Sequence, residues 1–278
     1  MAMKKLKSMI HHSLGWVLTA VFLLPLLWVL VASLRQVGLP PPTTVEWYQP
    51  DPQWQNYQTI FERVPMTRYL QNSLVVVATA VPLTLIIASM AGFGISQLPV
   101  RPRRQLVYVS IALLIVPAAA VWLFRFQILR WMGLLDSLWA LILPAFTGSN
   151  ALFVLLFYWT FRRIPGEMFE AAQLDGATAV TIWWRLALPL ARPTIVGVTV
   201  LTFVMYWSDF ISPILYIFSP RYYTLAVGLQ ILNQLDRTNW PLLMAGAVVM
   251  TAPVILMFFI LQRFFLHDLS LSNLFEKN

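Results

Sequence analysis

The sequence predicts an all-α membrane protein with six transmembrane helices. Of its 278 residues 59% are apolar and only 11% are charged, whereas a soluble domain carries about a quarter charged residues. The mean hydropathy is +0.71, and so large an apolar excess cannot be buried in a single soluble core. These observations together disfavour a soluble enzyme, a nucleic-acid-binding protein and a disordered chain.

Six stretches of the chain are nearly free of charged side chains and long enough to cross a bilayer as helices. In chain order they are 14–34, 73–95, 105–124, 138–161, 193–218 and 240–262. The first is too long for the apolar core of a signal peptide and lacks a cleavage site after it, so we expect it to remain as a helix. An even number of spans places both termini on the same side of the membrane.

Basic residues predict the orientation of these spans. With the N-terminus in the cytoplasm, the inner segments hold 12 of the Lys and Arg residues and the outer segments hold 7. Lys and Arg are enriched in cytoplasmic loops, so both termini are predicted to be cytoplasmic. The formal net charge of +8 is then a consequence of topology, and we expect membrane lipid rather than nucleic acid as a partner.

The spans divide the chain into five predicted parts. These are a cytoplasmic N-terminus at 1–13, the first transmembrane helix at 14–34, an outer loop at 35–69, a core of five helices at 70–263 and a cytoplasmic tail at 264–278. The outer loop is rich in proline, and we expect a short helix at 55–64 that lies on the membrane surface.

The sequence contains no pattern that would give the chain chemistry of its own. It has no cysteine, no Gly-x-x-x-x-Gly-Lys-Ser/Thr phosphate-binding loop and no His-Glu-x-x-His zinc motif. The three histidines, His11, His12 and His267, lie outside the predicted spans. We therefore expect no catalytic residue, no metal site and no bound cofactor. Asp209 is the one ionisable residue well inside a predicted span, which is fewer than proton-coupled pumps use.

The inner segment 162–192 differs from the other loops because it predicts a helix–turn–helix. Pro165 stands at a position favoured at helix starts, with acidic residues just after it where the helix dipole favours them. Gly176 stands where a left-handed cap would end this helix, and Thr178 can cap a second one. Leu188-Pro189 predicts the end of that second helix.

Two interpretations of this segment follow from physical chemistry alone. The small side chains of Ala171 and Ala172 would let another protein pack closely against the first helix. Alternatively, the two helices would form an amphipathic hairpin in the lipid headgroups. The residues by themselves favour neither.

The same segment resembles the EAA loop of permease subunits of bacterial ABC importers. The resemblance rests on Glu170-Ala171-Ala172, Asp175-Gly176-Ala177 and Leu186-Ala187-Leu188-Pro189 in this order and spacing. Matches along most of the chain resemble the second permease subunit of the carbohydrate-uptake branch, of the maltose and glycerol-phosphate types. They are Asn56-Tyr57, Arg68 to Leu74, Gly133 to Asp136, Trp207 to Phe210, Thr224 to Leu229 and Met244 to Ala247.

This resemblance implies a type I ABC importer permease fold in the bacterial cytoplasmic (inner) membrane. The chain would form half of a pathway for a sugar, oligosaccharide or sugar-like polyol, as a heterodimer with a second permease subunit. Two ATPase subunits would bind ATP and Mg, an external sugar-binding protein would deliver the cargo, and this chain would not be an enzyme. The residues implied to couple to the ATPases are Glu170, Ala171, Ala172, Asp175, Gly176, Ala177, Leu186, Leu188 and Pro189.

Four residues of the fifth predicted span are expected to approach the substrate pathway: Tyr206, Trp207, Asp209 and Phe210. Aromatic rings and an acid together suit a polyhydroxyl ligand, through stacking and hydrogen bonds to hydroxyl groups. Asp209 could instead pair with Arg221 or with a group of the partner subunit, as intramembrane acids commonly do.

Two other functions compete with an ABC permease. A self-sufficient secondary transporter or channel would carry internal inverted repeats and coupling-ion residues, and we find neither. An intramembrane enzyme would need dyads or metal ligands that the sequence lacks.

Overall fold

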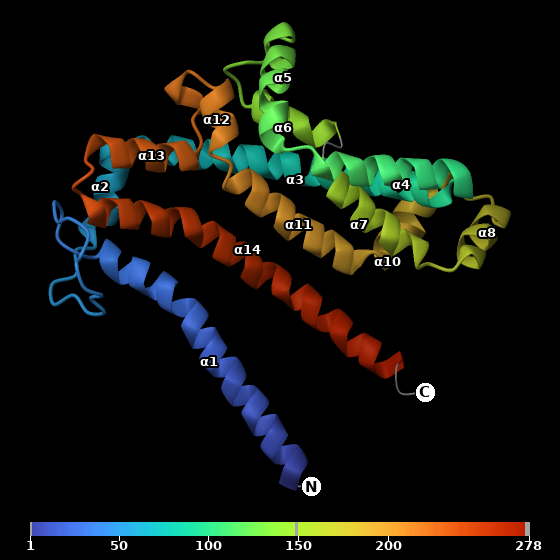
Figure 1. The fold of residues 1–278 in the computed structure, drawn as a ribbon, viewed down its shortest axis with the longest axis horizontal. Coiled ribbons are helices and arrows are strands. Elements are labelled where there is room, and N and C mark those ends of the chain that lie inside the picture. Colours follow the sequence, from blue (N-terminus) through green and yellow to red (C-terminus); the bar gives the residue numbers. More distant parts are fainter. Residues whose placement is uncertain (1, 148–149, 276–278) are drawn as a thin grey trace. The chain divides into compact units, whose positions relative to one another are not determined.

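The structure is a computed structural model that describes residues 2–147 and 150–275, without the side chains of 2–8, 10–11, 118 and 263–275. The described residues form helices and no strand (Figure 1), which confirms the all-α prediction. They group into two compact units. Unit 1 comprises Met1–Thr67 with Gly228–Pro253, and unit 2 comprises Arg68–Val227 with Val254–Asn278.

The number of membrane-spanning helices among the described residues lies between four and six. Four helices are long and apolar enough to cross a bilayer: His12–Ser33, Met66–Gln97, Trp139–Arg162 and Trp240–Gln262. Two further pairs of helices are long and apolar enough only when the two helices of a pair are counted as one. Val100–Ile115 and Ala119–Trp131 meet at a bend of 100°, and Ala179–Leu190 and Arg192–Trp207 meet at a bend of 84°. The predicted count of six therefore holds only if each bent pair is one span.

Unit 1 contains α1 (Ala2–Ser33), α2 (Gln55–Arg63) and parts of α3 (Met66–Gln97), α13 (Leu225–Leu235) and α14 (Trp240–Phe275). Every side chain of α1 from His12 to Leu27 is exposed in the single chain. This long apolar surface is suited to lipid or to another membrane helix. The predicted short helix at 55–64 is confirmed as α2, and its place on the membrane surface stays a prediction.

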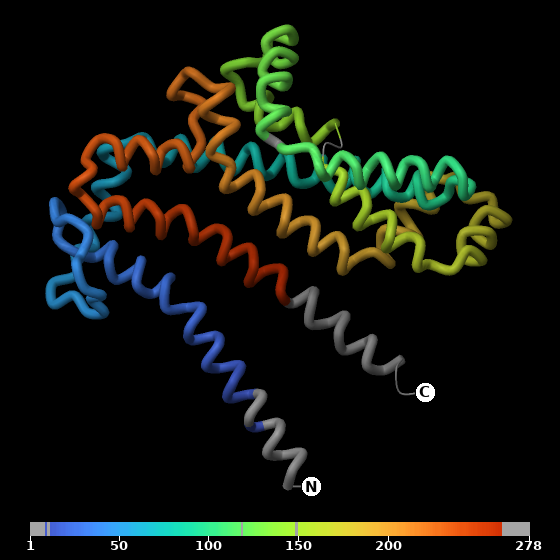
Figure 2. Tube along the Cα trace, viewed as in Figure 1, coloured from blue at the N-terminus to red at the C-terminus, as the bar shows by residue number. Residues whose placement is uncertain are grey.

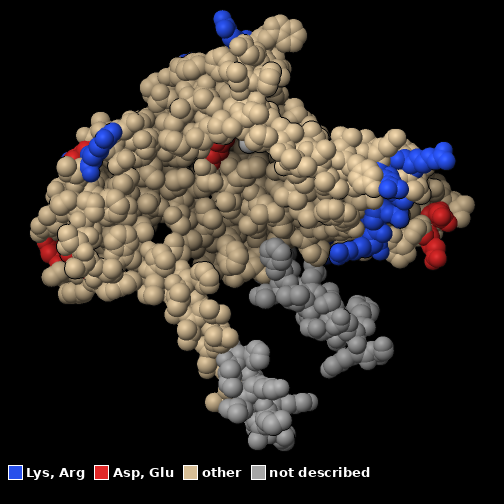
Figure 3. Space-filling view, in the orientation of Figure 1, with Lys and Arg blue, Asp and Glu red and all other residues tan. Residues whose placement is uncertain are grey.

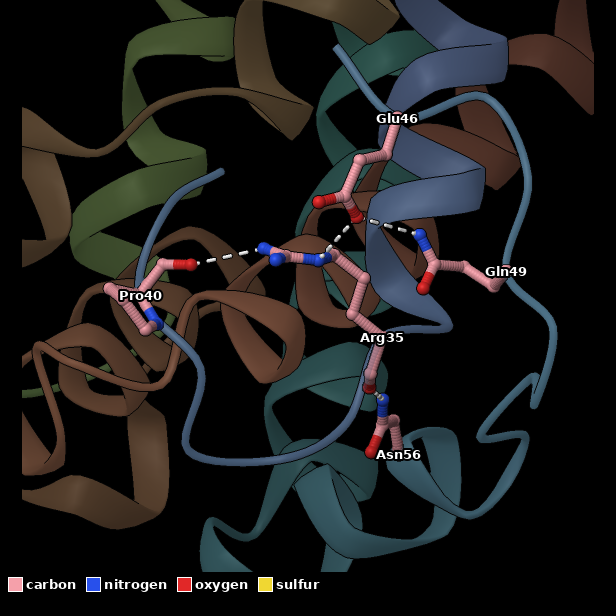
Figure 4. Close-up of polar contacts among 5 residues, drawn as sticks. All are labelled: Arg35, Pro40, Glu46, Gln49 and Asn56. Carbon is pink, nitrogen blue, oxygen red and sulfur yellow. Dashed lines mark hydrogen bonds and ion pairs between the residues drawn. The ribbon is translucent and has the colours of Figure 1, made fainter. Parts of the chain in front are cut away.

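Arg35 organises the loop between α1 and α2. Its guanidinium forms an ion pair with Glu46 (3.1 Å) and donates a hydrogen bond to the carbonyl of Pro40 (3.0 Å) (Figure 4). The Gln49 amide donates to the same Glu46 carboxylate at 3.1 Å. Arg35 is 9% exposed, whereas the Glu46 side chain is 40% exposed, so water reaches only the carboxylate end of the ion pair. Charge-assisted hydrogen bonds of this kind are among the stronger ones.

Asn56 attaches this loop to α2. It is buried, and its side-chain amide donates to the backbone carbonyls of Ser33 and Arg35 at 2.7 and 2.8 Å. The last residues of α1 thereby find hydrogen-bond donors for carbonyl groups that a helix end leaves unpaired. The proline-rich loop is consequently anchored at both of its ends.

Unit 2 contains most of α3 and a series of shorter helices, whose path Figure 2 traces. In order they are α4 (Val100–Ile115), α5 (Ala118–Trp131), α6 (Trp139–Phe146), α7 (Ala151–Arg162), α8 (Gly166–Leu174), α9 (Ala179–Ile182), the π-helix η1 (Trp183–Ala187), α10 (Leu188–Leu190), α11 (Arg192–Trp207), α12 (Ile211–Tyr216) and the 3-10 turn η2 (Pro220–Tyr222).

Two predicted spans differ from the structure because they are broken. The stretch predicted at 105–124 divides between α4 and α5, where Pro117 lacks an N–H group and holds Val116 in an extended conformation. The stretch predicted at 193–218 divides between α11 and α12, because the helix stops at Trp207 and restarts only after Phe210. The sequence did not predict either break, because the residues on both sides of each break are apolar.

Close packing of α3 against α7 fixes the frame of unit 2. A Cβ atom added at Gly92 would lie 2.7 Å from Phe157 Cβ and 2.8 Å from both the Tyr158 nitrogen and the Val154 carbonyl oxygen. Glycine is therefore the residue that allows this approach of two backbones. The surrounding core is apolar and includes Phe93, Phe153, Phe157, Phe161, Phe169 and Trp183.

Candidate coupling loop and substrate pathway

A glycine turn ends α8, the first helix of the segment 162–192. Gly176 has φ +79°, as predicted for a left-handed cap. Its N–H donates to the Gln173 carbonyl (2.9 Å), and the N–H of Ala177 donates to the Ala172 carbonyl (3.0 Å). These two bonds define a Schellman motif, which satisfies the last carbonyls of the helix. The turn is therefore a rigid corner.

The second helix of the segment begins at its predicted cap and ends within one residue of its predicted end. Thr178 accepts a hydrogen bond from the N–H of Thr181 at the start of α9. The helix then continues through η1 and α10 and ends at Leu190, one residue after the predicted end at Leu188-Pro189. The N–H of Leu188 reaches back five residues to the Trp183 carbonyl. This wide π turn accommodates the proline that follows.

Phe169 anchors α8 to the transmembrane helices. It is the buried residue of α8, and its ring lies 6.0 Å from the Phe93 ring on α3 at an interplanar angle of 68°. Phe93 in turn meets Phe161 of α7 edge-on at 5.8 Å. Such edge-to-face pairs stabilise packing beyond simple area burial. We had not singled out Phe169 in the sequence, although it directly precedes Glu170-Ala171-Ala172.

A shallow groove of about 460 Å³ lies between α8 and the α9–η1 helix. Among the residues predicted to couple to an ATPase, five line it: Ala171, Ala172, Asp175, Ala177 and Leu186. Glu170 and Gly176 are exposed, and Leu174 at the end of α8 is 90% exposed. An apolar side chain this exposed at the tip of a short helix is suited to contact with another protein.

The two remaining predicted coupling residues lie elsewhere. Leu188 and Pro189 line a different cavity of about 480 Å³, together with residues of α3 and α11 such as Leu85, Ile86 and Ile195. The structure therefore separates the motif into a groove-forming part and a part that packs where the chain bends into α11.

Charged side chains gather around α8. Figure 3 shows basic side chains clustered beside acidic ones at the end of unit 2 that α8 forms. The exposed residues there include Arg101 and Arg104 at the start of α4, Arg162 and Arg163 at the end of α7, and Glu167 and Glu170 on α8. Lys and Arg are enriched on the cytoplasmic side of membrane proteins, so this basic cluster agrees with the predicted orientation.

The predicted pathway residues lie at the break between α11 and α12. Asp209 is half-buried, and its carboxylate accepts a hydrogen bond from the N–H of Ser212 (3.0 Å), in the first turn of α12. Tyr206 and Phe210 are also half-buried, whereas Trp207 is 2% exposed and stacks on Phe203 at 5.6 Å. The Arg221 guanidinium lies 4.5 Å over the Tyr222 ring, and no Asp209–Arg221 ion pair forms among the described residues.

Asp136, in the loop between α5 and α6, fastens the segment that follows α12. It has φ 57°, and its carboxylate accepts hydrogen bonds from the Ser219 hydroxyl and from the N–H groups of Ser219 (2.7 Å) and Phe218 (3.0 Å). These bonds, with the Ser219 hydroxyl first, hold the pKa of the Asp136 carboxyl below its usual range. The sequence indicates a turn at this place through Gly133, three residues before Asp136, because glycine is typical of turns. It does not indicate the contact of Asp136 with Ser219.

The chain is similar to membrane components of binding-protein-dependent transport systems. Residues 80–270 match the family described as binding-protein-dependent transport system inner membrane component. The sulfoquinovosyl glycerol transport system permease protein SmoH of Agrobacterium fabrum is 29% identical over 241 residues, which cover 87% of this chain and 85% of SmoH. The trehalose transport system permease protein SugB of Mycobacterium tuberculosis is 28% identical over 248 residues, with 87% and 88% covered.

A solved structure has the same fold. A chain in the crystal structure of a bacterial ABC transporter involved in the import of the acidic polysaccharide alginate superposes with a TM-score of 0.76 and 21% identity, covering 94% of this chain and 97% of that one. With the family match spanning well over half of the sequence, this chain belongs to the binding-protein-dependent transport system inner membrane components and is an ABC transporter permease.

Proposed function

We propose that this chain forms half of the translocation pathway of an ATP-driven importer for a sugar, oligosaccharide or sugar-like polyol. The names of its relatives support a carbohydrate cargo, since SugB is named for trehalose transport. In this proposal the other half is a second permease subunit, two ATPase subunits hold ATP and Mg, and an external binding protein delivers the cargo. The chain itself performs no catalysis.

The segment 162–192 is proposed to couple the chain to an ATPase. The observation that carries this proposal is the groove between α8 and α9–η1, because five of the predicted coupling residues line it. Leu174 at the tip offers an apolar contact to the ATPase. Phe169 joins the segment to α3 and α7, so that closure of the ATPases on ATP would move the segment and unit 2 together. Such rigid-body transmission is a common way to couple nucleotide binding to a domain movement.

We further propose the predicted orientation in the bacterial cytoplasmic membrane, with both termini and the coupling segment inside. The chain contains no cysteine, so single introduced cysteines report their side without background. Arg103→Cys should react only from the cytoplasm and Arg221→Cys only from outside. Labelling of Arg103→Cys by an impermeant reagent in intact cells would overturn the orientation.

Reconstitution tests the proposed function as a whole. The chain, the second permease, the ATPase and the binding protein are placed in proteoliposomes, and uptake of labelled sugar is measured with and without ATP. We expect uptake only when all four components and ATP are present, and no ATP hydrolysis by the chain alone. ATP-independent uptake by the chain alone would favour a secondary transporter or channel instead.

A further inference from the structure

Arg125 on α5 is a half-buried guanidinium without an acidic partner. Among the residues whose side chains the structure describes, it forms no ion pair and no hydrogen bond. The buried Arg35 described above is, in contrast, engaged by Glu46 and Pro40. Withdrawing a charge from water without compensation is costly, and unpaired ionisable residues in membrane proteins mark functional sites.

The face of α5 that carries Arg125 packs toward the predicted substrate pathway. Trp122, one turn earlier on the same face, accepts a hydrogen bond at its carbonyl from the Tyr216 hydroxyl of α12 (3.1 Å). Leu129, one turn later, is completely buried in a core shared with Tyr216. Residues three to four apart lie on one helix face, so Arg125 is held between these two contacts.

Arg125 shares its surroundings with two residues already assigned to the pathway. Tyr206, at the end of α11, packs against the core that holds Leu129 and Tyr216, and Asp209 accepts a hydrogen bond from the first turn of α12. A cation, an acid and a half-buried tyrosine therefore stand on or next to elements that share this core. The cation and the acid do not neutralise one another, because no ion pair joins Arg125 to Asp209 among the described residues.

A small cavity with both polar and apolar walls lies next to Tyr206. It has a volume of about 10 Å³, comparable to one water molecule, and is lined by Thr84, Asn150, Met205 and Tyr206, among others. The Thr84 hydroxyl is buried and makes no hydrogen bond of ordinary geometry. The hydroxyl of Tyr206 is the polar neighbour of the Thr84 hydroxyl, so these two groups form the polar side of the cavity.

We propose that Arg125 binds the anionic group of an acidic sugar, a carboxylate or a sulfonate, as the sugar passes this point of the pathway. This inference rests on the proposed function, because it needs sugar to travel past Tyr206 and Asp209. Arg125 holds the anionic group, Asp209 accepts hydrogen bonds from sugar hydroxyls, and Tyr206 offers its ring and hydroxyl. A guanidinium suits this role because its planar fork matches an oxyanion with two parallel hydrogen bonds.

The test compares two sugars that differ only in charge. The complete importer is reconstituted with its binding protein, and ATP-driven uptake is measured for a disaccharide bearing a uronic acid and for the neutral disaccharide with a hydroxymethyl group in its place. We expect the wild type to prefer the uronate. Arg125→Gln should lower the ratio of uronate to neutral uptake by at least about tenfold, the effect of losing one charge-assisted hydrogen bond.

Two variants control for nonspecific effects of the substitution. Arg125→Lys keeps the charge and should preserve part of the uronate preference. Arg130→Gln removes an exposed arginine from the last turn of the same helix and should match the wild type. Complex assembly is followed by size-exclusion chromatography for each variant, and it should be normal for all three.

Each other outcome overturns a defined claim. Uptake of the neutral sugar alone by the wild type would overturn the inference on Arg125 and leave the proposed function standing. An unchanged uptake ratio in an assembled Arg125→Gln complex would overturn the inference, and loss of assembly in this variant would show that Arg125 has a structural role instead. Absence of ATP-driven uptake of both sugars by the assembled wild-type complex would overturn the proposed function as well.

Discussion

The ring of Phe169 on α8 lies edge-on to the ring of Phe93 on α3, with ring centroids 6.0 Å apart. Through this contact the short helix of the proposed coupling segment shares its core with helices α3 and α7. A displacement of α8 is therefore transmitted to them through packed side chains, because close-packed cores move as rigid bodies rather than deform.

Phe169→Ala should uncouple the segment from these helices. Truncating a buried phenylalanine costs about 3–5 kcal/mol through lost burial and a cavity, so we expect a lower thermal unfolding midpoint and ATP hydrolysis without sugar uptake. Leu174→Ala is the matched control for stability, because this side chain is 90% exposed and its removal should leave the midpoint unchanged. A wild-type ratio of uptake to hydrolysis in Phe169→Ala would contradict the proposed transmission.

Gly92→Ala should loosen the contact of α3 with α7. The new Cβ atom would approach backbone atoms of α7 to 2.8 Å, and overpacking of this kind costs about 1–3 kcal/mol. Gly94→Ala is the matched control, since it lies two residues away on the same helix with nothing within 4 Å of the added atom. Thermal unfolding in detergent distinguishes the two, and equal midpoints for both variants would refute the close approach.

Gly176→Val should disturb the corner after α8 while the spans still insert. A non-glycine residue in the left-handed region costs on the order of 1 kcal/mol, and more for a β-branched side chain. Gly166→Val adds the same side chain at the start of α8, where no positive φ and no close atom oppose it. We expect ATPase recovery in a pull-down to fall for Gly176→Val and to persist for Gly166→Val; the reverse order would exclude the turn as a determinant.

Asp209→Asn and Asp209→Ala separate two roles of the intramembrane acid. Asparagine can still accept the hydrogen bond from the Ser212 N–H, because Asn caps helices as well as Asp does, so assembly should remain normal while uptake falls. Alanine removes the cap as well, at a cost of about 1 kcal/mol. Normal uptake by Asp209→Asn in an assembled complex would remove the carboxylate from the pathway, and lost assembly would indicate a structural pairing.

Local signals in the sequence predicted the coupling segment well. The glycine cap at Gly176 and the threonine cap at Thr178 were found because each depends on a few neighbouring residues. The helix breaks at Pro117 and after Trp207 were not predicted. An uninterrupted apolar stretch indicates that a segment is long enough to span the membrane, but not that it forms one continuous helix. The helix end near Pro189 was predicted to within one residue, whereas the π turn before it was not predicted.

Long-range relationships could not be predicted from the sequence. Phe169 meets Phe93 across 76 residues of chain, and Asp136 meets Ser219 across 83; neither pair has a spacing that signals contact. Arg125 directly follows the third predicted span, at 105–124, and its position in the sequence signals no contact. Its lack of an acidic partner became visible once α5, α11 and α12 were placed together.

Recovery of the ATPase with the Leu174→Asp variant tests the coupling segment most directly. Leu174 is 90% exposed, so an aspartate there should leave the fold intact while it places a charge in an apolar contact. Val100→Asp is the control, because Val100 is 66% exposed at the start of α4, where the helix dipole favours an acid. With membrane insertion verified for both, we predict that Val100→Asp retains the ATPase and supports uptake and that Leu174→Asp does neither. Full ATPase recovery and wild-type uptake by Leu174→Asp would contradict the account.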